Sequence, residues 1–388
     1  MYRIGKEEIE EISKVINSTK LFKVNDGELQ ETMRLEEEMK EKFGADYAIA
    51  MTSGHAALVS ALIGMGIGPG DQVIVPAYTY IATAVAVIAA GAIPIIAEID
   101  ESLTLDPEDF ERKITAHTRA VIPVHIQGFP SNMDKICEIA KKHGLFVLED
   151  ACQADGASFG GRRLGTIGDA GAFSFNYFKI ITAGEGGALV TNNRDIYERA
   201  FIHHDSSAVA FFGNQLDGIT TEAFCGQEFR TNEITSAILR IQLKRLDGII
   251  ADLRRNKKYL MKKLEGCCSF IKSNDIEGDL GTTLALYFDT QEKAESFASN
   301  IGGTIPGKTH KHIYSSWAPV MNKRGAYHPL MDPFKMEANK DIIPDYTLDM
   351  CKRSLEILMR AVYVPVDPDM NEGELDALAE RIKSALNR

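Results

Sequence analysis

The stretch that decides the fold spans residues 47–97 and reads YAIAMTSGHAALVSALIGMGIGPGDQVIVPAYTYIATAVAVIAAGAIPIIA. It contains three strand-like apolar runs separated by two helical segments, at 47–51, 73–75 and 93–96 and at about 55–64 and 81–90. Strands that alternate with helices at this interval predict a mostly parallel sheet with helices on both faces. Ligands bind beyond the carboxyl ends of the strands in such sheets, so the loops at those ends are the first candidates for a site.

The same alternation continues toward the C-terminus. Further strands are predicted at 120–125, 145–148, 170–175 and 188–191, with a helix at about 132–143. Beyond these the pattern changes to a long helix at about 236–265, weaker strands near 284–288 and a last helix at about 370–386. We therefore predict an N-terminal helix within 1–19, a large α/β domain at 20–245 and a small C-terminal α+β domain at 246–388.

Composition excludes several classes of protein. The chain has 388 residues with 45% hydrophobic and 25% charged residues, as in ordinary globular proteins. A net charge of −12 argues against a nucleic-acid partner, which needs a positive surface. Pro76, Gly91 and Pro94 interrupt the uncharged stretch 72–97, so no membrane span is expected. The six cysteines form no CxxC pair, which favours reduced thiols in the cytoplasm and no metal site.

Two short motifs carry residues suited to chemistry at strand ends. Residues 148–153 read LEDACQ and place Asp150 where a buried strand ends. Such an acid could hold a protonated ring nitrogen, or could simply cap the next segment. Lys179 follows another strand, just before the glycine cluster 184–187. An uncharged lysine there could form a Schiff base, although a solvated loop lysine is the ordinary alternative.

A third element is the turn TSGH at 52–55, which opens a helix of small and apolar residues. Backbone N–H groups and the helix dipole make such a turn a phosphate site, although this signal alone is weak. Tyr80 adds an aromatic ring that can stack. A phosphate site, a ring-nitrogen acid, a Schiff-base lysine and a stacking ring together describe pyridoxal 5′-phosphate.

Three motifs make the chain resemble the DegT/DnrJ/EryC1/StrS family of pyridoxal phosphate-dependent sugar aminotransferases. They are SFNYFKIITAGEGG at 174–187, EDACQA at 149–154 and PAYTYIAT at 76–83. The resemblance is strong from about 45 to 245 and weak in the last third. It implies the aspartate aminotransferase-like fold (type I PLP fold), with a large mostly parallel sheet domain and a smaller α+β domain.

The resemblance also implies residue roles. Lys179 would form the Schiff base and then move a proton between the substrate carbon and the cofactor, while Asp150 would pair with the pyridinium nitrogen. The remaining implied cofactor contacts are Gln153 at the ring hydroxyl, Tyr80 on the ring face, and Ser53, Gly54, His55 and Ser174 at the phosphate.

A homodimer with shared active sites is implied as well, with Arg230 reaching the partner's cofactor. Two residues depart from the family pattern, since His55 stands where Thr is common and Glu228 where Asn is usual. His312 and Tyr314, in the segment that holds Trp317, are candidates for substrate contacts.

The predicted function is transfer of an amino group from glutamate or glutamine to a keto or aldehyde group of a sugar-like acceptor, with pyridoxamine 5′-phosphate as the intermediate form. A nucleotide-linked keto sugar is favoured, and an 8-carbon sugar acid or a cyclitol is possible. One alternative is a dehydratase or aromatising synthase of the same fold. Lys179 argues against the family's dehydratase branch, where histidine replaces it.

A second alternative, from another class, is a non-catalytic PLP-binding sensor. The intact set of Lys179, Asp150 and Gln153 weighs against a sensor. Elsewhere, His203 and His204 suggest a metal site only weakly and are predicted to lie in a loop near the site mouth. His125, at a strand end, is better explained as a hydrogen-bonded histidine of the core edge than as a substrate contact.

Overall fold

The computed structural model describes residues 3–208 and 218–387. Its centre is a seven-stranded sheet in which β9 runs antiparallel to β1 and β8, while all the other pairings are parallel. The strands, in spatial order, are β1 (Tyr47–Met51), β9 (Gly187–Thr191), β8 (Ala170–Ser174), β5 (Phe146–Asp150), β4 (Thr118–Val121), β2 (Gln72–Pro76) and β3 (Ile93–Ala97). The predicted α/β fold with a mostly parallel sheet is thereby confirmed.

Helices cover this sheet. They are α2 (Glu31–Phe43), α3 (Gly54–Gly64), α4 (Ala82–Ala89), α5 (Pro107–Arg112), α6 (Met133–His143) and α7 (Arg194–His204). Helix α3 packs between the sheet and helices α4 and α7, and nearly all of its residues are buried. A helix that is buried on all sides in this way is expected to carry apolar residues around its whole circumference, as α3 does.

Histidines 203 and 204 lie in the last turn of α7, so their predicted placement in a loop is wrong. The side chain of Asn193 begins this helix by accepting hydrogen bonds from the N–H groups of Asp195 and Ile196. His203 Nδ1 contacts Ser60 Oγ at 3.0 Å, and His204 Nδ1 contacts the Phe201 carbonyl at 2.6 Å. The first contact ties His203 to α3, and the second holds His204 against its own helix.

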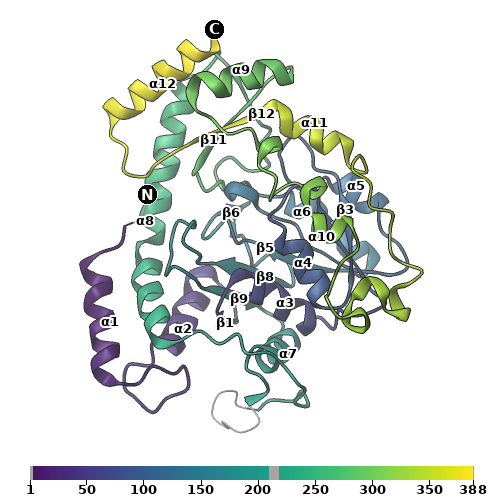
Figure 1. Ribbon diagram of the computed structural model, residues 1–388. Helices are drawn as coiled ribbons and strands as arrows, with labels where there is room; N and C mark the ends of the chain where they lie inside the picture. The colour runs from purple at the N-terminus through teal and green to yellow at the C-terminus, as the bar shows by residue number, and fades with distance from the viewer. Residues whose placement is uncertain (1–2, 209–217, 388) are drawn as a thin grey trace.

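One long helix, α8 (Glu233–Lys263), runs along the side of the molecule (Figure 1). Helices α1 (Lys6–Ser18) and α2 pack against its first part, and α12 (Glu372–Leu386) packs near its end. The predicted domain boundary at 245/246 falls inside α8, so this helix joins the two parts of the molecule.

A second, three-stranded antiparallel sheet lies toward the C-terminal end of α8 (Figure 1). It consists of β10 (Ser269–Phe270), β11 (Thr283–Tyr287) and β12 (Ala361–Pro365), and with α9 (Gln291–Ile301) and α12 it encloses its own hydrophobic cluster. Buried residues between Ile313 and Leu358, including Trp317, belong instead to the main hydrophobic cluster. The segment before α11 (Lys352–Arg360) therefore packs on the large sheet, and the residue limits of the domains stay a prediction.

The described chain also contains shorter elements. β6 (Ser158–Phe159) and β7 (Arg162–Arg163) pair as a small hairpin, and α10 (Ala318–Met321) follows the buried Trp317. Within residues 3–208 and 218–387, no helix is both long and apolar enough to cross a lipid bilayer.

Candidate active site

A cavity of about 600 Å³ opens at the carboxyl ends of the parallel strands. Its volume lies in the range of small-molecule sites. Residues that follow β1, β2, β5 and β8 line it, together with residues from the small sheet. The cavity brings together these predicted site residues: Ser53, Gly54, His55, Tyr80, Asp150, Gln153, Ser174, Lys179 and His312.

Asp150 ends β5 and is held by two donors. Its Oδ2 accepts a hydrogen bond from Thr83 Oγ1 at 2.7 Å, and its Oδ1 accepts one from the Cys152 N–H at 3.2 Å. Thr79 Oγ1 contacts Thr83 Oγ1 at 2.7 Å, which continues the chain of hydroxyls. These two donors fix the orientation of the Asp150 carboxyl group at the edge of the cavity.

Helix α3 begins at the edge of the same cavity. Ser53 caps it by accepting a hydrogen bond from the Ala56 N–H at 3.1 Å. A Cβ on Gly54 would lie 2.6 Å from Cys152 Sγ and 2.9 Å from Ser174 Cβ, so only glycine fits at this helix start. The N-terminal N–H groups of α3 and the hydroxyl of Ser174 thus surround a small space suited to a phosphate.

His55 is an uncharged ring in this arrangement. Burial lowers its pKa below the ordinary value. Its Nδ1 lies 3.3 Å from the carbonyl of Ala82 and donates to it, because a carbonyl can only accept. His55 therefore offers a phosphate its backbone N–H, while Nε2 of the neutral ring remains an acceptor.

Lys179 stands in a turn fixed by main-chain and side-chain hydrogen bonds. Its N–H donates to the Asn176 carbonyl at 2.9 Å, and the Asn176 side chain donates to Glu185 Oε1 at 2.9 Å. Lys179 itself is half-buried and lines the cavity. A rigid turn that presents one lysine to an enclosed space matches the role expected of a Schiff-base lysine.

Tyr80 and His312 form one wall of the cavity. Main-chain bonds from Thr79 and Ile81 to the carbonyls of His312 and Lys311 join the two segments. The rings of Tyr80 and His312 lie 5.7 Å apart between centroids. Burial lowers the pKa of His312 to about 4, and the charges of Lys311 and Lys179 add to this shift. At neutral pH His312 is therefore an uncharged hydrogen-bonding group.

Gln153 has its side-chain orientation set by a neighbour that sequence reasoning missed. Its Oε1 accepts the main-chain N–H of Gln127 at 3.1 Å, which leaves its amide nitrogen as the end that can donate into the cavity. Gln127 adopts a left-handed conformation (φ 54°) and is tied to the small sheet, because its Oε1 accepts a hydrogen bond from Thr283 Oγ1 at 3.1 Å. An isolated Gln127 in the sequence carries no signal for this contact.

Tyr314 and Arg230 are not among the residues that line the cavity. The Tyr314 side chain is buried in the main core, where its hydroxyl donates to the Leu348 carbonyl at 2.7 Å and accepts the Cys351 N–H at 3.1 Å. Arg230 donates to Asp205 Oδ1 at 2.6 Å and forms an ion pair with Glu228. Whether Arg230 reaches a partner's cofactor stays a prediction.

The acid next to Asp150 has a different role. Glu149 is fully buried and accepts hydrogen bonds from the N–H groups of Gly165, Ile167 and Gly168. His125 Nε2 lies 3.1 Å from its Oε2 and donates to it, since His125 Nδ1 is already the acceptor for the Ser131 N–H. His125 is thus a hydrogen-bonded core histidine, as the favoured interpretation of the sequence predicted.

Asp155 lines the cavity too, and sequence reasoning missed it. It is 1% exposed, and its Oδ1 has no hydrogen-bond partner among the described residues. An acid five residues after Asp150, among the small residues of ACQADGAS, was the signal that could have found it.

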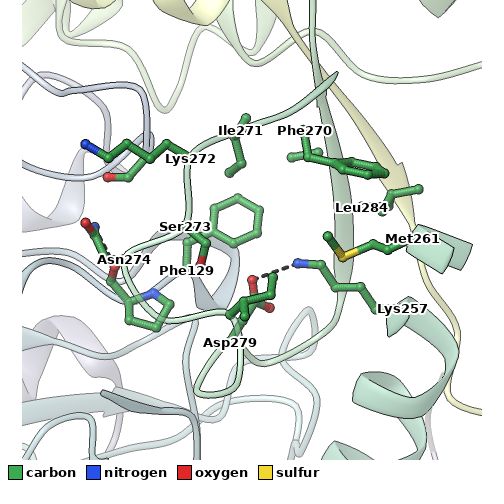
Figure 2. A pocket seen from close by; sticks show the side chains of 14 residues that line it. Phe129, Lys257, Met261, Phe270, Ile271, Lys272, Ser273, Asn274, Asp279 and Leu284 are labelled. Atoms are coloured by element: carbon green, nitrogen blue, oxygen red, sulfur yellow. Dashed lines mark hydrogen bonds and ion pairs between the residues drawn. The ribbon is translucent and has the colours of Figure 1, made fainter. Parts of the chain in front are cut away.

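Two other cavities lack the predicted residues. One, of about 20 Å³, has room for about a single water; Figure 2 shows Lys257 and Asp279 pointing toward each other there, with Nζ and Oδ2 2.7 Å apart. The other is an open groove of about 720 Å³ beside β12 and α12. In the part of the chain that the structure describes, no group of three His, Cys, Asp or Glu could hold a metal ion.

The chain belongs to the DegT/DnrJ/EryC1/StrS aminotransferase family, whose sequence pattern matches residues 2–297. It is 42% identical over 205 residues to a dTDP-3-amino-3,4,6-trideoxy-alpha-D-glucose transaminase of Streptomyces venezuelae, covering 52% of each chain. It is 36% identical over 300 residues to a GDP-perosamine synthase of Escherichia coli O157:H7, covering 77% of this chain and 81% of the relative.

Its fold is similar to that of 3-amino-5-hydroxybenzoic acid synthase, with a TM-score of 0.79 and 26% identity over 100% of this chain and 98% of that one. By sequence, the chain spans only 52% to 63% of the length of the first three curated relatives it matches. The predicted family and fold are confirmed, and the family makes pyridoxal 5′-phosphate the cofactor. The residues present fit this cofactor, because the cavity brings together the helix start and Ser174 for a phosphate, the carboxyl group of Asp150 and the amine of Lys179.

Proposed function

We propose that the protein transfers an amino group from glutamate or glutamine to a carbonyl group of a sugar-like acceptor. The observation that carries this proposal is the single cavity shared by Lys179, Asp150 and the start of α3. When bound, pyridoxal phosphate supplies an aldehyde that exchanges amino groups and a ring that withdraws electrons. The chain's own residues then decide how the cofactor sits and where protons move.

Each of those residues has one task. The start of α3 and Ser174 would hold the phosphate, and the Asp150 carboxyl group would face the ring nitrogen. The Gln153 amide N–H would donate to the ring hydroxyl oxygen. Lys179 Nζ would anchor the cofactor and, once free, would carry the proton that leaves the substrate carbon.

We further propose a nucleotide-linked keto sugar as the acceptor. Lys311 is the support from this chain, because it lines the cavity near the exposed rings of Tyr80 and Phe178. A diphosphate favours such a cation at the mouth of a site. Lys308 and Lys323 are paired with Glu295 and Asp345 instead. The names of the transaminase and synthase relatives, which refer to dTDP- and GDP-linked sugars, point the same way.

A homodimer with shared sites belongs to the same proposal. The segment that contains Glu228 and Arg230 is exposed or half-buried, and it pairs with β1 through a bridge between Met51 and Arg230. That placement near the sheet edge supports contact with a second copy, in which Arg230 would meet the partner's phosphate. The cysteines of the described chain form no disulfide, which fits a cytoplasmic protein.

The direct test is to locate the cofactor's attachment. Borohydride reduction of the loaded protein, followed by peptide mass mapping, should place the cofactor on the peptide that contains Lys179. The variant Lys179→Ala should keep its fold and lose both the label and amine transfer, whereas Lys311→Ala should keep the label and bind nucleotide-linked acceptors less tightly. Label on another lysine, or turnover by Lys179→Ala, contradicts the proposed roles.

The aromatising alternative retains one observation in its favour, the likeness to 3-amino-5-hydroxybenzoate synthase of Amycolatopsis mediterranei at 35% identity. That reaction would release water without consuming an amino donor. Product analysis with and without glutamate or glutamine separates it from transamination.

A further inference from the structure

The motif PAYTYIAT at 76–83 contains two buried threonines that the roles above do not use. Thr79 lies in the loop after β2 and is 1% exposed, and Thr83 lies in the first turn of α4 and is 0% exposed. The loop turns into the helix between them, so their hydroxyl oxygens come within 2.7 Å of each other. A hydroxyl buried to this degree needs hydrogen-bond partners, because leaving it without them is costly.

The hydrogen bonds of the two threonines run in one direction, toward Asp150. Thr83 Oγ1 donates to Asp150 Oδ2 at 2.7 Å. A hydroxyl has a single proton, so in the contact between the two threonines Thr79 is the donor and Thr83 the acceptor. The resulting series of hydrogen bonds leads from Thr79 through Thr83 to the carboxyl group at the end of β5.

The orientation of the Asp150 side chain depends on this series. The torsion that turns an aspartate carboxyl group has a broad range, so hydrogen bonds decide how the group lies. Its Oδ1 accepts the Cys152 N–H at 3.2 Å, a longer bond than the one from Thr83. Strand β4 lies between β2 and β5 in the sheet, so the bond from Thr83 ties the segment after β2 to the end of β5 across β4.

The first of the two threonines also holds the wall of the cavity that contains His312. The Thr79 N–H donates to the His312 carbonyl at 3.0 Å, and the Ile81 N–H donates to the Lys311 carbonyl at 3.2 Å. The main chain of Thr79 therefore fixes this wall while its hydroxyl supports Thr83. Thr79 thus connects the segment of His312 with the acid at the end of β5.

We propose that Thr83, supported by Thr79, is a positioning residue that holds the Asp150 carboxyl group in one orientation for the ring nitrogen of the cofactor. A carboxyl group that is already oriented does not have to be ordered when the cofactor binds, which favours binding. The inference rests on the proposed function, because it assumes that Asp150 faces the ring nitrogen.

A cofactor analogue separates this role from general support of the fold. Equilibrium dialysis of the full chain gives the dissociation constants of pyridoxal phosphate and of its 1-deaza analogue, in which a C–H group replaces the ring nitrogen. The ratio of the analogue's constant to the cofactor's reports the contact between Asp150 and the nitrogen, because the phosphate, ring hydroxyl and aldehyde are common to both molecules.

We expect Thr83→Val, which keeps the shape and removes the hydroxyl, to lower this ratio at least about threefold, as for the loss of one hydrogen bond. Thr83→Ser keeps the hydroxyl and should keep the ratio within about twofold of the wild-type value. A residue that only supported the fold would raise both constants equally, and the ratio would not change. An unchanged ratio in Thr83→Val therefore overturns the inference.

Thr32→Val is the matched control. Thr32 is also fully buried, and its Oγ1 also contacts a hydroxyl, Ser236 Oγ at 2.8 Å, but it lies in α2 and does not line the cavity. Its replacement should leave the ratio unchanged, and a fall equal to that of Thr83→Val overturns the inference. If Thr83→Val does not fold, Thr83→Ala gives the same comparison with the same two outcomes.

Asp150→Ala distinguishes a failure of this inference from a failure of the proposed function. It should lower the ratio at least as far as Thr83→Val does, and adding Thr83→Val to Asp150→Ala should change the ratio no further. If Asp150→Ala lowers the ratio and Thr83→Val does not, the positioning role alone is wrong. If Asp150→Ala leaves the ratio unchanged, Asp150 does not face the ring nitrogen, and both its proposed role and this inference are overturned.

Discussion

Glu149 and Asp150 are the last two residues of β5, and replacing each in turn should distinguish the acid that stabilises the fold from the acid that serves the reaction. Glu149 Oε1 accepts N–H groups from Ile167 at 2.6 Å and Gly168 at 2.7 Å. Its Oε2 accepts the Gly165 N–H at 2.8 Å and His125 Nε2 at 3.1 Å. In Glu149→Gln an NH₂ group replaces one oxygen, so two buried donors face another donor in either orientation.

Each donor left without an acceptor costs about 1–3 kcal/mol, so Glu149→Gln should lower the free energy of unfolding by about 2–6 kcal/mol. Asp150→Asn should behave differently. Its oxygen can still accept the Cys152 N–H, and its new NH₂ can donate to Thr83 Oγ1 once that hydroxyl rotates. We expect a stability change within about 1 kcal/mol, but amine transfer reduced about a hundredfold because the ring nitrogen has lost its charged partner.

The assay has two arms, urea unfolding of the cofactor-free protein by circular dichroism and amine transfer by the loaded protein. The stability loss should appear in Glu149→Gln, and the specific loss of amine transfer should appear in Asp150→Asn. If Asp150→Asn unfolds as easily as Glu149→Gln, or if Asp150→Asn transfers amines at the wild-type rate, the reasoning about this pair is refuted.

Three further changes probe the site and the fold. Gly54→Ala places a Cβ 2.6 Å from Cys152 Sγ, so it should weaken cofactor binding at least tenfold, as measured by equilibrium dialysis. Adding Cys152→Ala should recover part of this loss. Unchanged binding in Gly54→Ala would contradict the phosphate site at the start of α3. Burial lowers the pKa of His312 in the folded protein to about 4, so its neutral ring contributes fully to the free energy of unfolding above the ordinary histidine pKa of about 6.5. That contribution falls as the pH drops from about 6.5 toward 4, and His312→Asn should remove this pH dependence in urea unfolding. An unchanged pH dependence in the variant would contradict the buried neutral ring. Lys257→Met leaves the buried Asp279 without its ion pair and should lower the free energy of unfolding by about 3–5 kcal/mol in urea. Adding Asp279→Asn should recover much of this loss. Additive losses in the double variant would contradict the pairing seen in Figure 2.

The layout of the large sheet was predictable because both the spacing of the apolar residues and the turn residues between elements are clear in the sequence. The runs at 73–75 and 93–96 differ from β2 and β3 by at most one residue at each end. Glycine and small-residue turns mark where α3 begins and where the loop after β8 returns into β9. Loops at the carboxyl ends of parallel strands necessarily share one edge, so the meeting of Ser53, Asp150 and Lys179 followed from the alternation alone.

The contacts that were missed depend on tertiary structure. Tyr314 and His312 are two residues apart, yet one is buried under Leu348 and Cys351 and the other faces the cavity. Local sequence does not reveal which of the two side chains enters the core, because this depends on packing against a segment over thirty residues away. Gln127 is similar, since its role arises from contacts with Gln153 and Thr283.

The absorbance spectrum of the loaded protein, before and after addition of glutamate or glutamine with no acceptor present, reports directly whether Lys179 carries the cofactor and whether an amino donor releases it. The account predicts that the band of the lysine-bound cofactor disappears as pyridoxamine phosphate forms, and that Lys179→Ala never shows the band. A band that persists unchanged with both donors would contradict the proposed amino donors. A wild-type protein that develops no band with added pyridoxal phosphate would contradict the assignment of Lys179 and of the whole site.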